Sequence, residues 1–260
     1  MTYFDETAAS YDQLFTFSEI GKKQRRHVWL YLEKVLPKNK SWNILELNCG
    51  TGEDALFFAE KEHHVLATDI SGKMVEVTRQ KVQSNGFEEL VTTKTLNIEA
   101  LNEQVFDRKF DLVLSNFGGL NCLPKTSLAR LSDDLSRVLK HNGRFIAIVM
   151  PRFCLWEHLY FLLKLKPSEI LRRTQEKVMA SGEVPTWYYS PREFSHIFHS
   201  RFKYVDQKPI GIALPPSYLE PFFAKRKSWL SLLDKLEHQV NRIALFSSVA
   251  DHFLIDLKRK

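Results

Sequence analysis

The stretch ILELNCGTGEDA, residues 44–55, decides the fold of this chain of 260 residues. The apolar run from Ile44 to Leu47 predicts a strand, which leads into a turn containing Gly50 and Gly52, and a helical pattern follows. Glycines at such a turn let a ligand approach the backbone at the carboxyl end of a strand. Two glycines this close together are informative here because the whole chain has only 10 glycines. The stretch therefore predicts a nucleotide-type binding site.

Short apolar runs alternate with helical patterns through the first 150 residues. Such alternation is typical of βαβ units and of a parallel sheet covered on both faces. We therefore predict an α/β fold, a Rossmann-like, doubly wound and mostly parallel sheet. Two later runs, Phe202–Ile212 and the C-terminal HFLIDLKRK, are expected to complete the same sheet, with the C-terminal strand antiparallel. The earlier predicted strands are Ile44–Leu47, Val65–Thr68, Val91–Leu96, Phe110–Ser115 and Gly143–Met150.

The segments before and after this core differ from it in composition and in their predicted elements. Ser18 and Pro37 are placed as the N-cap and the stop of a helix, whose KKQRR cluster (residues 22–26) is interpreted as a solvated basic face. After Met150, 15 aromatic residues fall within residues 151–235. We therefore divide the chain into N-terminal helices (1–40), a binding core (41–150), aromatic-rich insertions that include one sheet strand (151–250) and a final strand (251–260). Helical patterns are expected over 155–165, 168–180 and most of 218–246.

Charge and composition exclude several classes of protein. The formal net charge of +6 is uneven, because residues 151–260 hold 18 Lys and Arg against 11 Asp and Glu. Three cysteines without CxxC spacing predict reduced thiols and no metal site. No run approaches the ~20 apolar residues of a membrane span, and MTYFDETAAS does not have the pattern of a signal peptide. A cytoplasmic protein is expected, with its oligomeric state open.

Two ligands compete for the glycine turn. Gly50, Gly52 and Ala55 satisfy the dinucleotide pattern GxGxxA, with Asp69 where a ribose-binding acid would stand, so an NAD(P)-binding protein is one alternative. Glu53 and Asp54, however, occupy the first helical turn, where two carboxylates would repel a pyrophosphate. Together with Glu46 they favour a ligand of net positive charge, such as S-adenosylmethionine.

At residues 40–150 the chain resembles the class I S-adenosylmethionine-dependent methyltransferases, and among them the small-molecule type 11/25 enzymes. ELNCGTG resembles the family's first motif, in which an acidic residue and a glycine-rich turn hold the methionine part of the cofactor. Asn48 stands where a glycine is usual, and asparagine tolerates a positive φ. The resemblance assigns Glu46, Asn48, Gly50 and Gly52 to cofactor binding.

Two further motifs follow from the same resemblance. VLATDIS, residues 65–71, is similar to the second motif, so Asp69 is expected to accept the ribose hydroxyls and Ile70 to pack on the adenine. Asn97 stands where a polar residue meets the adenine amino group, and Ile98 would lie under the ring. These four residues predict the adenosine end of the cofactor site.

The resemblance also assigns the methyl-transfer end. Asn116 and Phe117 begin the loop after the fourth strand, which in the family lines the transfer pocket and here lacks the Asn-Pro-Pro-aromatic sequence of certain nitrogen methyltransferases. Tyr11, in the Tyr-Asp element, is expected to lie over the cofactor as part of an N-terminal lid. Arg25 or Arg26 is the candidate partner of the methionine carboxylate.

The predicted function is O- or C-methylation of a small-molecule or lipid-like acceptor, anionic in one interpretation, by direct in-line transfer. An RNA or tRNA methyltransferase using the basic C-terminal region is an alternative, although acids are interspersed there and no RNA-binding module is visible. A non-catalytic protein of the same fold is another. No catalytic residue is assigned. The candidates for a base are His158, Tyr160, Tyr188 and Tyr189.

Overall fold

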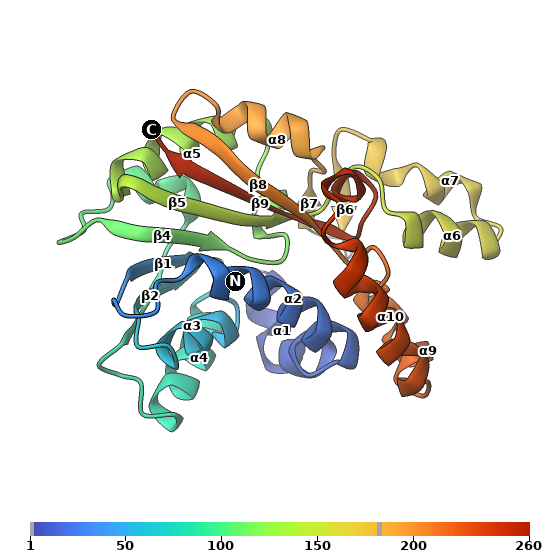
Figure 1. Ribbon diagram of the computed structural model, residues 1–260, viewed down its shortest axis with the longest axis horizontal. Coiled ribbons are helices and arrows are strands. Elements are labelled where there is room, and N and C mark those ends of the chain that lie inside the picture. The colour runs from blue at the N-terminus through green and yellow to red at the C-terminus, as the bar shows by residue number, and fades with distance from the viewer. Residues whose placement is uncertain (1–2, 181–183) are drawn as a thin grey trace.

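A seven-stranded sheet forms the centre of the protein (Figure 1). The computed structural model describes residues 3–180 and 184–260. The strand order is β3-β2-β1-β4-β5-β9-β8, with β9 antiparallel to both of its neighbours and the other pairs parallel. The predicted α/β class and the joining of both C-terminal strands to the sheet are confirmed. The strands are β1 (Asn43–Leu47), β2 (His64–Asp69), β3 (Val91–Thr95), β4 (Phe110–Ser115), β5 (Leu139–Val149), β8 (Phe202–Ile210) and β9 (His252–Arg259).

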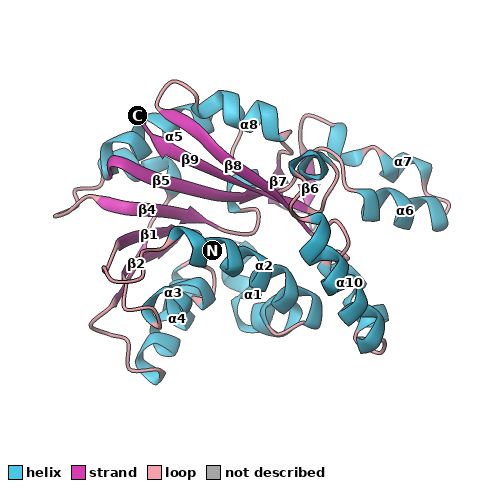
Figure 2. Cartoon of the chain, in the orientation of Figure 1, coloured by secondary structure: helices cyan, strands magenta, loops and turns pink. Residues whose placement is uncertain are grey.

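Helices cover both faces of the sheet (Figure 2). Helices α2, α3 and α4 contribute apolar side chains to the core on one face, and α5 and α8 contribute to the core on the other. These positions follow from the helical spacing of their apolar residues, which buries one side of each helix. The covering helices are α2 (Glu19–Val35), α3 (Glu53–Ala59), α4 (Gly72–Ser84), α5 (Lys125–Val138) and α8 (Pro191–Phe198).

The sheet register brings three strand ends to one edge. Leu47 of β1 pairs with Ser115 of β4, and Glu46 pairs with Ala67 of β2, so the turns after these parallel strands lie side by side. Strand order reverses between β1 and β4, the switch point at which open α/β sheets bind ligands. The predicted site residues on three separate motifs therefore meet at one edge.

The N-terminal segment forms α1 (Tyr3–Tyr11), a short π-helix η1 (Asp12–Thr16) and α2. Ser18 caps α2, as predicted, because its hydroxyl accepts a hydrogen bond from the Gly21 N–H at 2.9 Å. The helix ends at Val35, two residues before Pro37. Helix α1 packs against α4 and so approaches the carboxyl edge of the sheet.

The helix predicted over residues 168–180 is not present in the structure. Residues 168–180 do not form a continuous helix, because Arg172 and Arg173 turn back to share the buried carboxylate of Glu157. The chain then forms a two-stranded antiparallel sheet of β6 and β7. The helical stretch expected over 218–246 is broken into short pieces around one longer helix. These elements are α6 (Leu155–Leu163), α7 (Pro167–Ile170), η4 (Arg172–Thr174), β6 (Val178–Ala180), β7 (Val184–Thr186), η5 (Ser217–Leu219), α9 (Glu220–Phe223), α10 (Lys227–Val240) and η6 (Ala244–Ser248).

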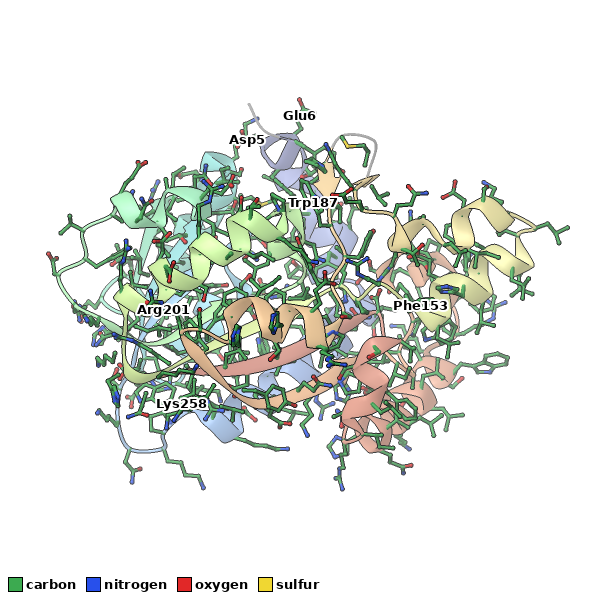
Figure 3. The ribbon with its side chains drawn as sticks, turned by 90° about the horizontal axis from the view of Figure 1, so that it is seen from above. Asp5, Glu6, Phe153, Trp187, Arg201 and Lys258 are labelled. Atoms are coloured by element: carbon green, nitrogen blue, oxygen red, sulfur yellow. The ribbon has the colours of Figure 1, made fainter. Side chains whose placement is uncertain are left out.

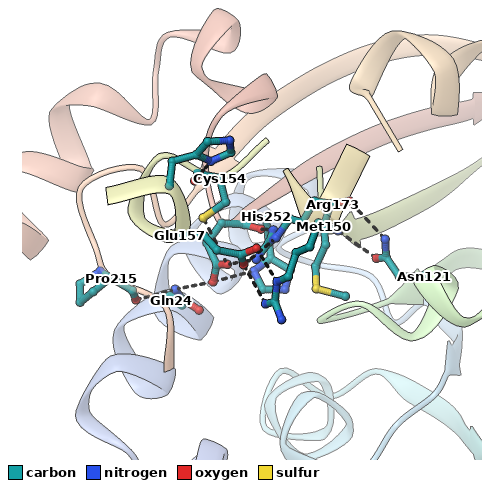
Figure 4. Close-up of polar contacts among 11 residues, drawn as sticks. Gln24, Asn121, Met150, Cys154, Glu157, Arg173, Pro215 and His252 are labelled. Carbon is teal, nitrogen blue, oxygen red and sulfur yellow. Dashed lines mark hydrogen bonds and ion pairs between the residues drawn. The ribbon is translucent and has the colours of Figure 1, made fainter. Parts of the chain in front are cut away.

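A buried polar cluster joins this insertion to the sheet domain (Figure 4). The Arg173 guanidinium lies 2.9 Å from Glu157 and 3.2 Å from Asp251, which precedes β9. Asp251 also lies 3.2 Å from His252 and accepts a hydrogen bond from Gln24 of α2. Because these charges are almost fully buried, each depends on its partner for solvation. The cluster fixes α6 and η4 against α2 and β9.

Candidate functional site

A cavity of about 400 Å³ opens at the carboxyl edge of the sheet, where the turns after β1, β2 and β4 meet. Helix α1 and strand β7 supply its outer wall. This is the switch-point position expected for a ligand site. Its lining residues are Tyr3, Phe4, Tyr11, Asn48, Gly50, Asp69, Ile70, Met74, Asn97, Ile98, Glu99, Asn116, Phe117, Gly118, Gly119, Cys122, Leu123, Met150, Val184 and Thr186.

The cavity brings together nine of the eleven residues predicted as a site. Glu46 and Gly52 are not among its lining residues in the described part of the chain. The nine come from the N-terminal segment and from the four turns that follow β1, β2, β3 and β4. They are Tyr11, Asn48, Gly50, Asp69, Ile70, Asn97, Ile98, Asn116 and Phe117.

The two glycines of the turn have different roles. Gly50 has a φ of +54°, and a β-carbon there would meet only the Tyr11 ring, at 3.8 Å, on the cavity side. Gly52 has a φ of +87°, and a β-carbon there would lie 2.6 Å from the Thr78 methyl group of α4. Gly50 therefore leaves room for a ligand beneath Tyr11, whereas Gly52 is required for the packing of α3 against α4.

Glu46 is buried near the turn without lining the cavity. Its Oε2 atom has no hydrogen-bond partner among the described residues. Burial, with the charge of Asp54 next in effect, raises the pKa of this carboxyl well above its ordinary value. A buried carboxyl with a spare oxygen is suited to accept a hydrogen bond from a donor group on a ligand.

Asp69 is oriented by the backbone on both sides. One carboxylate oxygen accepts from the Gly50 N–H and the other from the Ser71 N–H, both at 2.9 Å. Burial nevertheless raises the pKa of Asp69. Each oxygen retains a second lone pair, so the carboxylate can accept two further hydrogen bonds from a ligand diol. Ile70 follows with an exposed side chain on the cavity.

Asn48 links the turn after β1 to the loop after β4. It adopts a φ of +48°, as expected for an asparagine in place of glycine. Its side-chain amide donates to the Asn116 carbonyl at 2.7 Å and accepts from the Ser115 hydroxyl at 2.6 Å. This residue therefore holds two walls of the cavity together.

Asn97 and Ile98 lie at the third turn, with the Asn97 side chain exposed and that of Ile98 half-buried. The Asn97 side-chain oxygen accepts from the Glu99 N–H at 3.0 Å, which caps the 3₁₀ segment η2 (Ile98–Glu103). The oxygen expected to meet the adenine thus already has one partner, and its second lone pair and the amide nitrogen are available.

Arg25 corrects the interpretation of KKQRR as a wholly solvated face. Arg25 is buried and its Nη1 lies 2.6 Å from Asp54 Oδ2, whereas Arg26 is exposed. The guanidinium also lies over the Phe117 ring, 5.1 Å from its centroid. Together with Tyr11 and Gly50, these residues line a small hollow beside the main cavity.

The carboxylates of the first helical turn are paired within the protein. Asp54 accepts hydrogen bonds from Arg25, Trp29 and Asn116, and Glu53 lies 2.7 Å from Lys81. The interpretation that Glu53 and Asp54, together with Glu46, favour a positively charged ligand is therefore corrected, because the charges of Glu53 and Asp54 are compensated by Lys81 and Arg25.

Tyr11 and Asp12 act on opposite sides of the N-terminal segment. Tyr11 faces the cavity, and burial raises the pKa of its hydroxyl. Asp12 accepts a hydrogen bond from the Thr51 hydroxyl at 2.5 Å and lies 2.7 Å from Lys81. A second attachment joins Asp5 to the Ser71 hydroxyl at 2.6 Å. The segment is thus fastened to the turns after both β1 and β2.

Comparison with known proteins identifies this arrangement. Residues 44–143 match the model of a methyltransferase domain family. These residues form a class I S-adenosylmethionine-dependent methyltransferase domain. The matched range contains the turns after β1 to β4 and so most of the cavity wall.

Three relatives show the extent of the similarity. A demethylmenaquinone methyltransferase of Clavibacter sepedonicus is 31% identical over 55% of this chain and 54% of its own length. A ubiquinone/menaquinone biosynthesis C-methyltransferase UbiE of Geotalea daltonii is 29% identical over 70% of this chain and 77% of its own length. The crystal structure of magnesium protoporphyrin IX methyltransferase from Synechocystis PCC 6803, with bound SAH, has a TM-score of 0.61 at 15% identity, covering 99% and 97% of the two chains. The chain thus covers only about half of the first relative, and the third shows the fold alone.

The residues of the methyltransferase domain fit S-adenosylmethionine. The spare oxygen of Glu46 and the open face of Gly50 suit the methionine part, and the free lone pairs of Asp69 suit the ribose. The dinucleotide alternative, which shares Gly50 and Asp69, is set aside by the family match.

Several cavity residues of the methyltransferase domain and its surroundings were not predicted. Some of them lie within a few residues of the motifs quoted above, namely Met74, Glu99 and Cys122. Two others, Gly118 and Gly119, belong to the loop after β4 that begins with Asn116. Tyr3, Phe4, Met150, Val184 and Thr186 reach the cavity only through tertiary packing. Among these, only Tyr3 and Phe4 had a sequence signal, as aromatic residues shortly before the Tyr-Asp element.

The candidate bases do not line the cavity in the described part of the chain. The Nδ1 atom of His158 is bonded to the Cys154 carbonyl, and its ring stacks on Phe153. Tyr160 packs on Tyr218. Tyr188 lies under Arg173, and the Tyr189 hydroxyl donates to the Leu123 carbonyl. All four have structural roles in the insertion or its junction with the methyltransferase domain.

Proposed function

We propose that the protein transfers the methyl group of S-adenosylmethionine directly to a small, apolar acceptor with a hydroxylated, quinone-like ring. One observation carries the proposal: the cavity joins the motif residues Gly50 and Asp69 to an apolar wall supplied by other elements. The printed names of the relatives, a demethylmenaquinone and a ubiquinone/menaquinone biosynthesis methyltransferase, support the acceptor class.

The cofactor would lie across the turns after β1, β2 and β3. Asp69 would accept the ribose hydroxyls, and Ile70 and Ile98 would pack on the adenine. Glu46 would accept from the amino group of the methionine part. Arg25, beside Gly50 and Tyr11, is the proposed partner of the methionine carboxylate.

The acceptor would lie on the remaining wall. Phe117, Leu123, Met150 and Val184 present apolar side chains to the cavity, which favours a flat apolar ring over a charged acceptor. Gly118 and Gly119 leave the floor of this part without side chains. The basic excess of the C-terminal region is thus not needed for acceptor binding.

The chain contributes alignment and exclusion of water. When bound, S-adenosylmethionine supplies a methyl group on a sulfonium, a good leaving group, so the in-line displacement requires mainly a correct approach. The Tyr11 segment, held by Asp12, closes the cavity over this position. Burial raises the pKa of the Cys122 thiol to about 11, so this cavity residue is neutral near pH 7 and is not the base.

The proposal is tested in two steps. Calorimetry with S-adenosylhomocysteine measures cofactor binding, and absence of binding would reject the proposed enzyme. Transfer of a radiolabelled methyl group is then measured with a short-chain hydroquinone, a simple phenol and an RNA pool. Labelling of the hydroquinone supports the acceptor class, labelling of the phenol alone favours a general phenol methyltransferase, and labelling of RNA alone overturns the small-molecule proposal. The Asp69→Ala enzyme, in which cofactor binding is expected to be weakened, is the control with reduced transfer.

A further inference from the structure

Two helical segments of the insertion form a lobe that projects from the sheet domain. We use the name projecting lobe for residues 155–170, which contain α6 and α7, together with residues 217–240, which contain η5, α9 and α10. Figure 1 shows this lobe beyond the carboxyl ends of β4 and β5. In Figure 3, Phe153 at its base lies across the molecule from Arg201 and Lys258.

Helix α6 carries apolar side chains on two sides. Trp156 faces inward, against the Phe223 ring and Leu230 of the other half of the lobe. On the outer side, leucines recur at a spacing of four, three and one residues, which places them on one helical face. All four are exposed, Leu163 to 83%. They are Leu155, Leu159, Leu162 and Leu163.

Helix α10 repeats this arrangement. Leu230 and Glu237 are buried toward the protein. Trp229, Leu232 and Leu236 recur at a spacing of three and four residues on the outer face and are exposed to 63%, 60% and 41%. Apolar residues of this size on two outward helix faces are a feature of surfaces that meet another apolar phase.

Four of the five acids of the projecting lobe are bound by groups of the protein, and the fifth, Glu169 of α7, is half-buried. Glu157 is paired with Arg172 and Arg173, and Asp234 lies 2.9 Å from both Lys23 and His27. Glu237 is fully buried and accepts hydrogen bonds from the backbone N–H groups of residues 211–214. Glu220 accepts from the first two N–H groups of α2. These carboxylates therefore contribute little negative charge to the outer surface.

Basic residues of the same lobe remain exposed around the apolar stripes. Three lie next to Trp229 at the start of α10, one lies further along this helix, and two follow the leucines of α6. They are Lys225, Arg226, Lys227, Lys235, Lys164 and Lys166. The outer surface of the lobe therefore carries exposed basic side chains next to its exposed apolar ones.

We infer that the projecting lobe docks on the surface of an anionic lipid bilayer. Helices that lie in a bilayer interface typically carry leucine and tryptophan on one face, bordered by lysine and arginine. Anionic headgroups attract these basic residues. Charge complementarity and the outward projection of both stripes favour a fluid bilayer over a rigid protein groove. In the described residues, no helix is long and apolar enough to cross a membrane, so the lobe would lie on the surface.

Cosedimentation of the full chain with vesicles tests the inference. The vesicles contain either phosphatidylcholine alone or phosphatidylcholine with about one third phosphatidylserine, near physiological salt. Binding to the anionic vesicles is expected, with at least tenfold weaker binding to the neutral ones. The apolar variant combines Trp229→Gln, Leu232→Gln and Leu236→Gln, and the charge variant combines Lys225→Gln, Lys227→Gln and Lys235→Gln. Each is expected to weaken anionic binding at least tenfold.

A matched control separates the lobe from net charge. Lys38, Lys40 and Lys109 are exposed and lie just before β1 and β4, at the opposite edge of the sheet. Replacing all three by Gln removes the same charge as the charge variant and should leave vesicle binding within about twofold of the original. Equal loss in this control would overturn the inference, as would no binding of the unmodified chain to anionic vesicles.

A second measurement distinguishes other occupants and other failures. If sedimentation velocity shows dimers that the apolar variant abolishes, without vesicle binding, the face is an interface between two copies and the lipid inference is wrong. Calorimetry with S-adenosylhomocysteine shows whether each variant retains the cofactor site, since none of the replaced residues lines the cavity. The inference therefore stands or falls separately from the proposed methyl transfer.

Discussion

The side-chain amide of Asn48 fills the space that a β-carbon on residue 119 would need. Such a β-carbon, built on Gly119, would lie 2.3 Å from Asn48 Cγ. The same amide bonds to Ser115 and to the Asn116 carbonyl. An asparagine in place of the usual glycine of the first motif is thus accommodated by a glycine in the loop after β4, and the two loops become one unit.

Gly119→Ala is expected to destabilise the protein by about 1 to 3 kcal/mol, because the methyl group would displace the Asn48 amide in a packed site. The double variant Asn48→Gly, Gly119→Ala should recover part of this loss. Urea unfolding measures both. Gly72→Ala is the control, since its β-carbon would meet only Thr95 Oγ1 at 3.9 Å. Strictly additive effects of the two substitutions would show that the residues are not coupled.

Asp69→Ala is expected to weaken S-adenosylhomocysteine binding by about 1 to 3 kcal/mol, because the ribose hydroxyls would lose their acceptor. Asp69→Asn keeps one acceptor oxygen and should have a smaller effect. Calorimetry measures the affinity, and circular dichroism checks the fold, because Asp69 also accepts from Gly50 and Ser71. Unchanged affinity in folded Asp69→Ala would remove the ribose assignment. Asp107→Ala, at an exposed loop position, is the control.

The attachment of Asp12 should depend on pH. Burial opposes ionisation, but the bonds from Lys81 and Thr51 outweigh it and lower the pKa of Asp12. A lowered pKa in the folded state contributes stability above the unfolded value of about 3.9, and this is lost as pH falls through the folded pKa. The contribution is about 1 kcal/mol. Asp12→Asn should therefore be less stable than the original chain near pH 6, and this difference should shrink as the pH falls below about 4.

Stability against urea between pH 6 and pH 3 provides the measurement for Asp12. Limited proteolysis of the N-terminal segment over the same range reports whether the loss is local. A difference between Asp12→Asn and the original chain that stays constant down to pH 3 would contradict the assignment of the titration to Asp12. Glu6→Gln, on the exposed side of α1, serves as the matched charge control.

Arg173→Met should destabilise the protein by about 3 to 5 kcal/mol, because it leaves Glu157 and Asp251 buried without their shared cation. The guanidinium cannot be replaced by Arg172, which bonds to Glu157 alone among these two carboxylates. Adding Glu157→Gln should restore part of the loss, because it removes one of the two buried carboxylates that shared the Arg173 guanidinium. Thermal unfolding measures all three chains. A loss in Arg173→Met no larger than that of exposed Arg26→Met would contradict the role of the cluster.

The recognised motifs predicted most of the cofactor side of the cavity, because parallel strands bring the turns after β1, β2, β3 and β4 to one edge. Once the alternation of strands and helices is recognised, Gly50, Asp69, Ile98 and Asn116 must lie near one another. The outcome for Glu46 and Gly52 was different. Both belong to the same motif, yet neither lines the cavity among the described residues. Glu46 is buried near the turn, and Gly52 is needed because Thr78 leaves no room for a side chain there.

Pairing of charges could not be predicted, because it depends on residues far apart in the chain. Glu53 and Asp54 read as free acids in the sequence, but Lys81 and Arg25 reach them through the packing of α4 and α2. Residues 168–180 have a helical pattern, but the two arginines there bond to Glu157 and end the helix. Local propensity is weaker than a buried ion pair.

The sequence by itself determined the α/β class, the glycine turn and the order of the cofactor motifs, since these depend on local periodicity and on short spacings. Only the tertiary structure decided which acids remain uncompensated, which residues close the cavity and where the C-terminal basic excess is exposed. Those properties depend on contacts between α2, α4, the insertion and the sheet. The physical reason is that desolvation and pairing of a charge are set by its three-dimensional neighbours rather than by its neighbours in sequence.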